Sequence, residues 1–149
     1  AKAKAKANAL KSMNNAGQLT KTMIFTALDN DGNLPDSDRW CDSIFKEVGT
    51  LKVYASPQDS FAMSQVDKGI KVSSYAFNKA LSGKKEAEVN PNTVMIFETD
   101  LGWNGSGGLE DALEFLEFFD GQAIAVSTVD GTVRQVSNPF ELRQMRWDP

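Results

Sequence analysis

The first 28 residues constrain the fold more strongly than any other part of the chain. The segment AKAKAKANALKSMNNAGQLTKTMIFTAL contains no proline and one glycine, and it is rich in alanine and lysine, which favour helices. Apolar and small residues recur in it at spacings of three and four, at Leu10, Met13, Gly17, Thr20, Ile24, Ala27 and Leu28. This spacing predicts one long helix with a continuous packing face. We expect the helix to end at residues 29–32, because Gly32 can adopt a left-handed conformation and Pro35 prevents further helix.

The start of this helix carries charges of unfavourable sign. Lys2, Lys4 and Lys6 precede the packing face, and no capping residue lies before them. Lysine at a helix N-terminus opposes the helix dipole, which favours acidic side chains there. Two interpretations are open at this point: an upstream part of the helix is missing from this sequence, or the helix begins here with an exposed, frayed turn.

Charge is strongly segregated along the chain, although the net charge is only -4. Residues 1–28 carry five lysines and no acid, whereas residues 86–133 carry ten acids and no lysine or arginine. This asymmetry suggests that one end of the molecule attracts an acidic partner and another repels anions. Nucleic acid is not the expected partner, because no basic patch is interleaved with aromatic residues.

Short elements are expected after the long helix. A second helix is predicted over residues 39–48, with Ser37 or Asp38 as its cap and Gly49 just past its end. Segments rich in β-branched or aromatic residues predict strands at 51–55, 70–77, 93–98, 123–128 and 132–136. Asp130-Gly131 predicts a two-residue hairpin turn in which both central residues have positive φ.

Two further helical segments complete the expected fold. Residues 109–119 have leucine and phenylalanine at helical spacing, and Asn138-Pro139 can open a last helical turn. A helix followed by closely spaced strands predicts an α+β fold, with a long N-terminal α-helix packed on a small antiparallel β-sheet and short inserted helices. The 149 residues suffice for a single domain, with residues 1–28 as a helical stem and 29–149 as a globular head.

Composition excludes several classes of catalysis. The chain has no histidine and one cysteine, Cys41, so mechanisms built on serine–histidine–aspartate or cysteine–histidine groups are excluded, as is a disulfide within the chain. Cys41 is expected to be a small core residue. There is no nucleophile-elbow sequence and no phosphate-binding loop. We therefore expect no enzyme activity and assign no catalytic, cofactor-binding or metal-ligating residue.

Two acidic clusters need separate interpretation. Glu110, Asp111, Glu114 and Glu117 are expected to form a solvated helix face, whereas a carboxylate-based hydrolase would need two acids from separate elements that converge in a pocket. The residues of Asp29-x-Asp31-x-Asn33 are expected to form a turn, because Gly32 precedes the third ligand position of a calcium loop instead of following it.

Several motifs, taken in order, resemble those of a known family. The long helix and the turn Asp29-Asn30-Asp31-Gly32-Asn33-Leu34-Pro35 come first. Residues 74–83 then match the pattern Ser-Tyr-x-x-Asn-x-x-Leu-x-Gly, and the strand Pro91-x-Thr93-Val94-Met95-Ile96-Phe97-Glu98 follows. Asp120 and Asp130-Gly131 align with a signature of histidine, nine residues and Asp-Gly. Over residues 1–136 the chain resembles the mature soluble part of type IV pilin-like proteins, which include the major pseudopilins of type II secretion.

The chain departs from this family in three places. Asp120 stands where histidine is usual, so any role of that histidine is lost. Ala55-Ser56-Pro57 replaces a Cys-Pro-Ser step, so the disulfide of some relatives cannot form. Residues 101–119 are longer and more helical than the family loop.

The resemblance implies a structural subunit of a type IV pilus or type II secretion pseudopilus, which polymerises through its N-terminal helix without catalysis. It implies a prepilin leader and a hydrophobic half-helix upstream, and the half-helix would anchor the precursor in the inner membrane of a bacterial cell envelope. It also implies methylation of the subunit. The assembled subunit would be periplasmic or extracellular. Its partners would be further copies in a homo-oligomeric filament, other pseudopilins and secretion-machinery proteins. The alternative is a periplasmic ligand- or protein-binding domain that forms no filament.

Calcium is a candidate ligand through the resemblance, since some major pseudopilins hold it in a C-terminal loop. The acids that could contribute are Asp100, Glu110, Asp111, Asp120 and Asp130. They lack the spacing of an ordered calcium loop, so a repulsive acidic surface is the preferred interpretation and no cofactor is assigned.

The two ends of the long helix are expected to have different partners. We expect Leu10, Met13 and Gly17 to contact other subunits and Ile24 and Leu28 to pack on the sheet.

Overall fold

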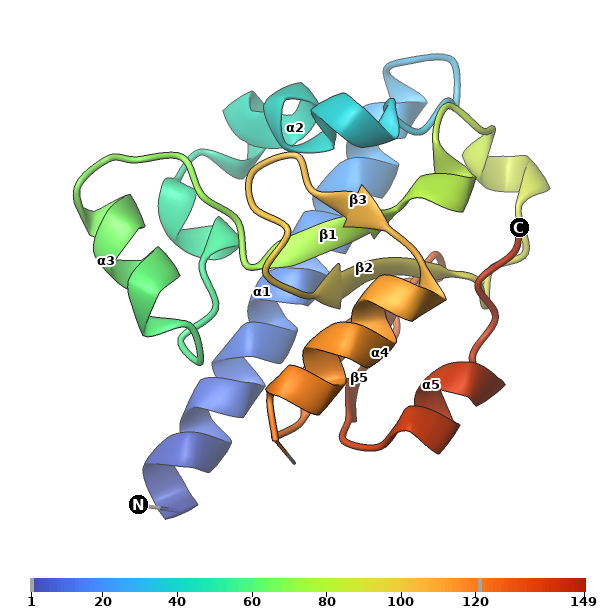
Figure 1. The fold of residues 1–149 in the computed structure, drawn as a ribbon. Helices are drawn as coiled ribbons and strands as arrows, with labels where there is room; N and C mark the ends of the chain where they lie inside the picture. The colour runs from blue at the N-terminus through green and yellow to red at the C-terminus, as the bar shows by residue number, and fades with distance from the viewer. Residues whose placement is uncertain (1, 121) are drawn as a thin grey trace.

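The computed structural model describes residues 2–120 and 122–149, and it is an α+β fold built around one long helix. Helix α1 (Lys2–Leu28) lies across one face of a five-stranded sheet, and its N-terminal end extends away from the body of the molecule (Figure 1). The predicted stem helix is confirmed from Lys2 onward, and Ala1 lies outside the described residues. The turn after it is confirmed too, because Gly32 has φ 82° and donates its N–H to the Ala27 carbonyl.

The sheet is mixed, with the strand order β3-β1-β2-β4-β5. The strands are β1 (Tyr75–Asn78), β2 (Val94–Glu98), β3 (Ser106–Gly107), β4 (Ile124–Thr128) and β5 (Val133–Val136). Strands β1, β2, β4 and β5 pair antiparallel, but β3 pairs parallel with β1. The expectation of a wholly antiparallel sheet is therefore wrong at this edge. A two-residue strand containing glycine has too little pattern to be recognised in the sequence.

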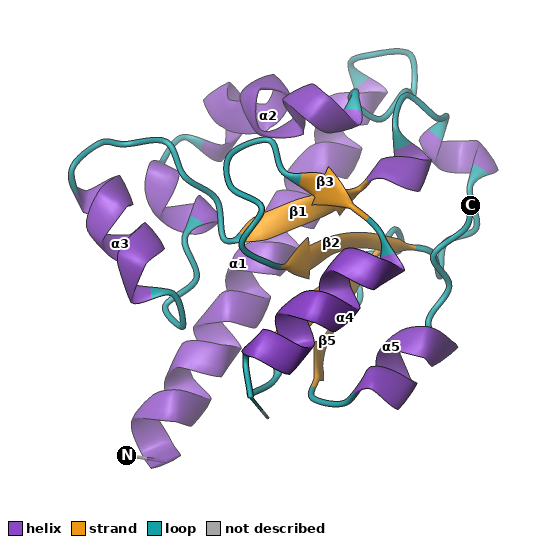
Figure 2. Cartoon of the chain, viewed as in Figure 1, coloured by secondary structure: helices purple, strands orange, loops and turns teal. Residues whose placement is uncertain are grey.

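Helices cover both faces of the sheet, with α1 and α2 (Trp40–Val48) on one face and α4 (Leu109–Phe118) and α5 (Pro139–Gln144) on the other (Figure 2). Helix α3 (Ser60–Asp67) lies to one side and packs in a separate small cluster with Ala55. One apolar core lies between α1, α2 and the sheet, and a second lies between the sheet, α4 and α5. Because helices pack on both faces, every residue of β1, β2 and β4 is buried. Because of a bulge between Val94 and Phe97, the successive residues Met95 and Ile96 both belong to the first core.

The packing face of α1 is rotated relative to the predicted one. Its buried residues are Ser12, Ala16, Gly17, Leu19, Thr20, Met23 and Ala27. Leu28 is 67% exposed, so its predicted packing on the sheet is wrong, while Ile24 is half-buried against the core. Gly17 lies under β5, where an added Cβ would approach the Val133 side chain to 3.3 Å. Of the three residues expected to contact other subunits, only Leu10 is exposed.

Several smaller predictions are confirmed. Helix α2 ends where Gly49 adopts φ 81°, and the helices predicted at 109–119 and after Asn138 are α4 and α5. The strands predicted at 93–98, 123–128 and 132–136 are β2, β4 and β5, each one residue shorter.

Other local predictions are wrong. Residues 51–54 form a 3₁₀ helix instead of a strand, because the Thr50 hydroxyl accepts a hydrogen bond from the Lys52 N–H and starts a turn. Of the segment 70–77, only Tyr75–Phe77 belongs to a strand. Helix α3 was not expected at all; Asp59 caps it by accepting from the Ala62 N–H.

The hairpin between β4 and β5 lies at the predicted position but has a different turn. The Gly131 N–H donates to the Thr128 carbonyl, and the Thr128 N–H donates to the Thr132 carbonyl, both at 2.9 Å. This pattern makes a three-residue loop in which Gly131 alone of the predicted pair has positive φ, at 90°. Asp130 instead accepts a hydrogen bond from the Thr132 N–H and so closes the turn with its side chain.

Candidate functional site

A single buried carboxylate lies where α1 crosses the sheet. Glu98, the last residue of β2, is 1% exposed. Its oxygens accept hydrogen bonds from the Ser12 and Ser56 hydroxyls, each at 2.8 Å, and from the Ala125 N–H at 2.9 Å. Gln58 Nε2 donates to both carboxylate oxygens, at 3.0 and 3.2 Å. The carboxylate thereby joins α1, two strands and the segment after the 51–54 turn.

Tyr75 extends this cluster toward β1. Its hydroxyl lies 2.9 Å from the Ser12 hydroxyl and 3.1 Å from the Ser12 carbonyl oxygen. Burial raises the pKa of the Glu98 carboxyl, although the hydrogen bonds from Ala125, Ser56, Ser12 and Gln58 oppose that rise. Burial likewise raises the pKa of Tyr75. Every group around Glu98 is a donor, which is the arrangement that satisfies a carboxylate.

The buried cluster fastens α1 to the sheet. Removing one member of this cluster is costly, because the site is buried and a group that loses its hydrogen-bond partner there cannot bond to water instead. The sequence signal for this cluster is the placement of an acid at the end of the apolar strand VMIFE. Its partners could not be read from the sequence, since Ser12 is 86 residues away.

The acids singled out in the sequence are not brought together. In the part of the chain that the structure describes, no group of three or more histidine, cysteine, aspartate or glutamate side chains could hold a metal ion. Asp111 accepts from the Gly108 N–H at the start of α4, and Asp130 belongs to the hairpin turn. Glu110, Glu114 and Glu117 are exposed on α4. Asp29, Asp31 and Asn33 lie in the turn after α1.

Asn104, in the loop between β2 and β3, caps the N-terminus of α2. Asn104 Oδ1 accepts from the Cys41 N–H at 2.8 Å and the Asp42 N–H at 3.2 Å, and Asn104 itself has φ 58°. The predicted cap at Ser37 or Asp38 is therefore wrong, because those residues form a 3₁₀ turn. Cys41 is fully buried, as expected for a core residue, and burial raises its pKa to about 12.

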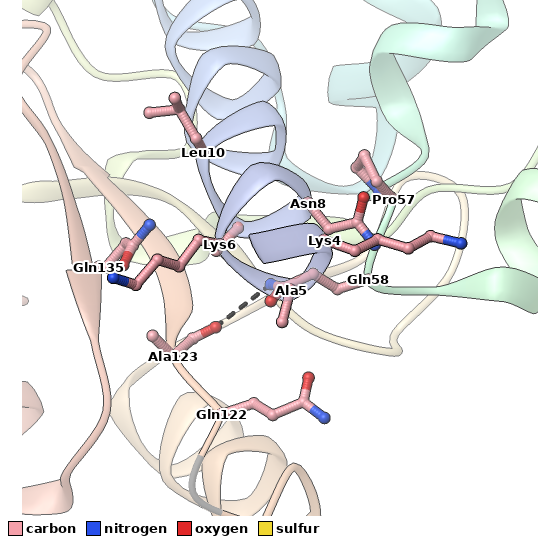
Figure 3. A pocket seen from close by; sticks show the side chains of 11 residues that line it. Lys4, Ala5, Lys6, Asn8, Leu10, Pro57, Gln58, Gln122, Ala123 and Gln135 are labelled. Atoms are coloured by element: carbon pink, nitrogen blue, oxygen red, sulfur yellow. Dashed lines mark hydrogen bonds between the residues drawn. The ribbon is translucent and has the colours of Figure 1, made fainter. Parts of the chain in front are cut away.

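Residues 2–11 of α1 contain no buried side chain and are called the free end of α1 below. A groove lies beside them (Figure 3). Its volume is about 810 Å³, and its walls come from the first turns of α1 and from segments that include Pro57, Gln58, Ala123 and Gln135. Gln58 donates to the Ala123 carbonyl at 3.2 Å across one side of it. Lys4 and Lys6 leave α1 on opposite sides in Figure 3. Gln58 also bonds Glu98, so the groove adjoins the buried cluster.

The fold and its surfaces define an α+β protein with a long, partly uncovered N-terminal helix. None of the helices among residues 2–120 and 122–149 combines the length and apolar character needed to cross a membrane. Comparison with protein-family models, with curated proteins and with solved structures gives no match.

Proposed function

We propose that this chain is a structural subunit of a pilin-like filament, in a type IV pilus or a type II secretion pseudopilus, and that it assembles through the free end of α1. The observation that carries the proposal is the division of α1. Side chains from Lys2 to Ala7 are all exposed, and the first buried residue is Ser12. About ten residues, or about 15 Å of helix, therefore lie outside the core.

This uncovered end differs from an ordinary surface helix. Surface helices of globular proteins usually bury one apolar stripe along their length. In α1 the buried stripe ends at Ser12. Leu10 lies on a different side of the helix, is 57% exposed and belongs to none of the described core clusters. A second copy of the chain, or another subunit of the same filament, would supply the missing contact. In this proposal the subunit belongs to a bacterial cell envelope, with an inner-membrane-anchored precursor and secretion-machinery proteins as partners.

The two ends of α1 offer a matched test in cells. Leu10 and Leu28 are exposed to similar extents, 57% and 67%, but only Leu10 lies at the free end. With the gene's complete product expressed in a bacterial host that assembles such filaments, Leu10→Asp should abolish filaments counted by electron microscopy. Leu28→Asp should leave their number unchanged, and both variants should melt like the parent domain. Filaments that persist with Leu10→Asp would contradict the proposal.

The groove beside α1 favours a second candidate, a periplasmic ligand- or protein-binding domain. Its volume of about 810 Å³ lies within the range of ligand pockets. If the unchanged protein forms no filament and a ligand raises its melting temperature in a Gln58-dependent manner, this candidate replaces the first.

A further inference from the structure

Two exposed helical surfaces carry clustered charge of opposite sign. On α1, Lys2, Lys4 and Lys6 are all exposed, and residues 2–28 contain no acidic side chain. On α4, Glu110, Glu114 and Glu117 repeat at intervals of four and three, so they share one exposed stripe. Like charges at this spacing repel, and the last turn of α4 holds no basic residue to offset Glu117.

Neither surface is neutralised within the described chain. Among residues 2–120 and 122–149, the one ion pair within 4.0 Å joins Arg134 and Glu141, which belong to neither surface. The two surfaces also lie in different layers. Helix α1 packs on one face of the sheet with the first core, whereas α4 packs on the opposite face with the second (Figure 1).

The surfaces match in chemistry beyond their charge. The groove beside α1 combines Lys4 and Lys6 with side-chain amides and with the apolar residues Leu10 and Pro57. The stripe on α4 combines its glutamates with Phe118, which is 80% exposed and follows Glu114 by one helical turn. An aromatic ring beside carboxylates is complementary to an apolar patch beside lysines and amides.

We propose that the groove beside the free end of α1 receives the acidic face of α4 from a second copy of this chain. The contact is heterologous, because groove and acidic face are different surfaces. A pair of copies therefore leaves the groove of one copy and the α4 face of the other free, and repetition of the contact produces an open chain of subunits. This inference rests on the proposed function, to which it adds the partner surface and its polarity. Charge complementarity sets the choice of partner and the encounter rate.

Zero-length crosslinking tests the contact directly. A carbodiimide joins a carboxylate to a lysine only when the two touch, so an equal mixture of ¹⁵N-labelled and unlabelled chain reports which copies are linked. We expect amide links between Lys4 or Lys6 and Glu114 or Glu117, with half of the linked peptide pairs carrying one label each. The yield should fall at about 1 M salt, where the Debye length is about 3 Å. Absence of these links, or links confined to peptides of one isotope, would overturn the proposal.

Charge-reversal variants of the two surfaces test the contact independently of folding. One variant carries Lys2→Glu, Lys4→Glu and Lys6→Glu, and the other carries Glu110→Lys, Glu114→Lys and Glu117→Lys. Circular dichroism checks that both fold. Each variant alone should fail to self-associate in sedimentation experiments, because its groove and α4 face then have the same sign. An equal mixture should associate, since each groove again meets an α4 face of opposite charge. Association of either variant alone, or none in the mixture, would contradict the proposal.

The same variants distinguish this inference from the proposed function when they are expressed in cells. Filaments from the unchanged protein and from the co-expressed pair, but from neither variant alone, would support both. Filaments of equal number from every form would overturn this contact and leave the filament function standing. No filament from the unchanged protein, together with mixed-isotope crosslinks in solution, would reject the filament function while retaining the contact.

Discussion

The two halves of α1 have the same covalent geometry and opposite surroundings. Residues 12–27 place Leu19, Met23 and Ala27 in the apolar core, and Ser12 holds the buried Glu98. Residues 2–11 contain no buried side chain. One helix thus contributes its second half to the stability of the domain and leaves its first half for contacts with other molecules. Changes in the two halves should therefore affect different measurements.

The largest expected effect comes from the apolar part of the buried half. Leu19 of α1 is fully buried in the first core. Leu19→Ala should therefore lower the free energy of unfolding by about 2–5 kcal/mol, because apolar burial is lost and a cavity is left behind. Leu10→Ala and Leu28→Ala should each change it by less than about 0.5 kcal/mol, since both side chains are largely exposed. Denaturant melts measure all three. Equal losses for Leu19 and Leu10 would remove the distinction between the two halves.

A smaller effect is expected where the buried half meets the carboxylate. Ser12→Ala removes a donor to Glu98 and leaves the Tyr75 hydroxyl with one partner fewer. The loss should be roughly 1–3 kcal/mol, the usual cost of orphaning a buried polar group. The control is Thr22→Ala, which removes a hydroxyl bonded only to the backbone of its own helix on the exposed side. If the two variants melt alike, the cluster does not fasten α1.

The Glu98 carboxyl should make stability fall as pH rises. Burial raises its pKa in the folded state, so the folded chain binds this proton more readily than the unfolded chain does. Stability from this group is therefore complete below the unfolded pKa and is lost as pH rises through the folded pKa. The slope approaches about 1.4 kcal/mol per pH unit for one proton. Glu98→Gln should remove this slope in unfolding measured above about pH 4.5. An unchanged slope in that variant would assign the pH dependence to other groups.

Sequence patterns captured the elements better than their contacts. Helix α1 and the turn that follows it at Gly32 are predicted by local composition, and β2, β4 and β5 are predicted by short apolar runs. The predicted phase of α1 is wrong because the buried face includes the polar residue Ser12, which a count of apolar residues leaves out. Helix α3 lacks a strong apolar stripe and depends on the Asp59 cap.

The candidate site was hidden because its contacts are remote in sequence. Glu98 meets Ser12 across 86 residues and Ser56 across 42, and Asn104 caps α2 across 63. Such pairs depend on how the layers stack, which no local pattern records. The charge segregation, in contrast, was visible in the sequence, because exposed charges do not depend on packing.

Hydrogen exchange along α1 tests the central claim most directly, because it reports each half of the helix separately. In the isolated chain, amides of residues 2–11 should exchange rapidly and amides of residues 12–27 slowly, as expected for a helix with one uncovered end. In assembled filaments of the complete gene product, residues 2–11 should become protected while residues 12–27 change little. Residues 2–11 that exchange equally fast in both forms would contradict the assignment of the free end of α1 to assembly.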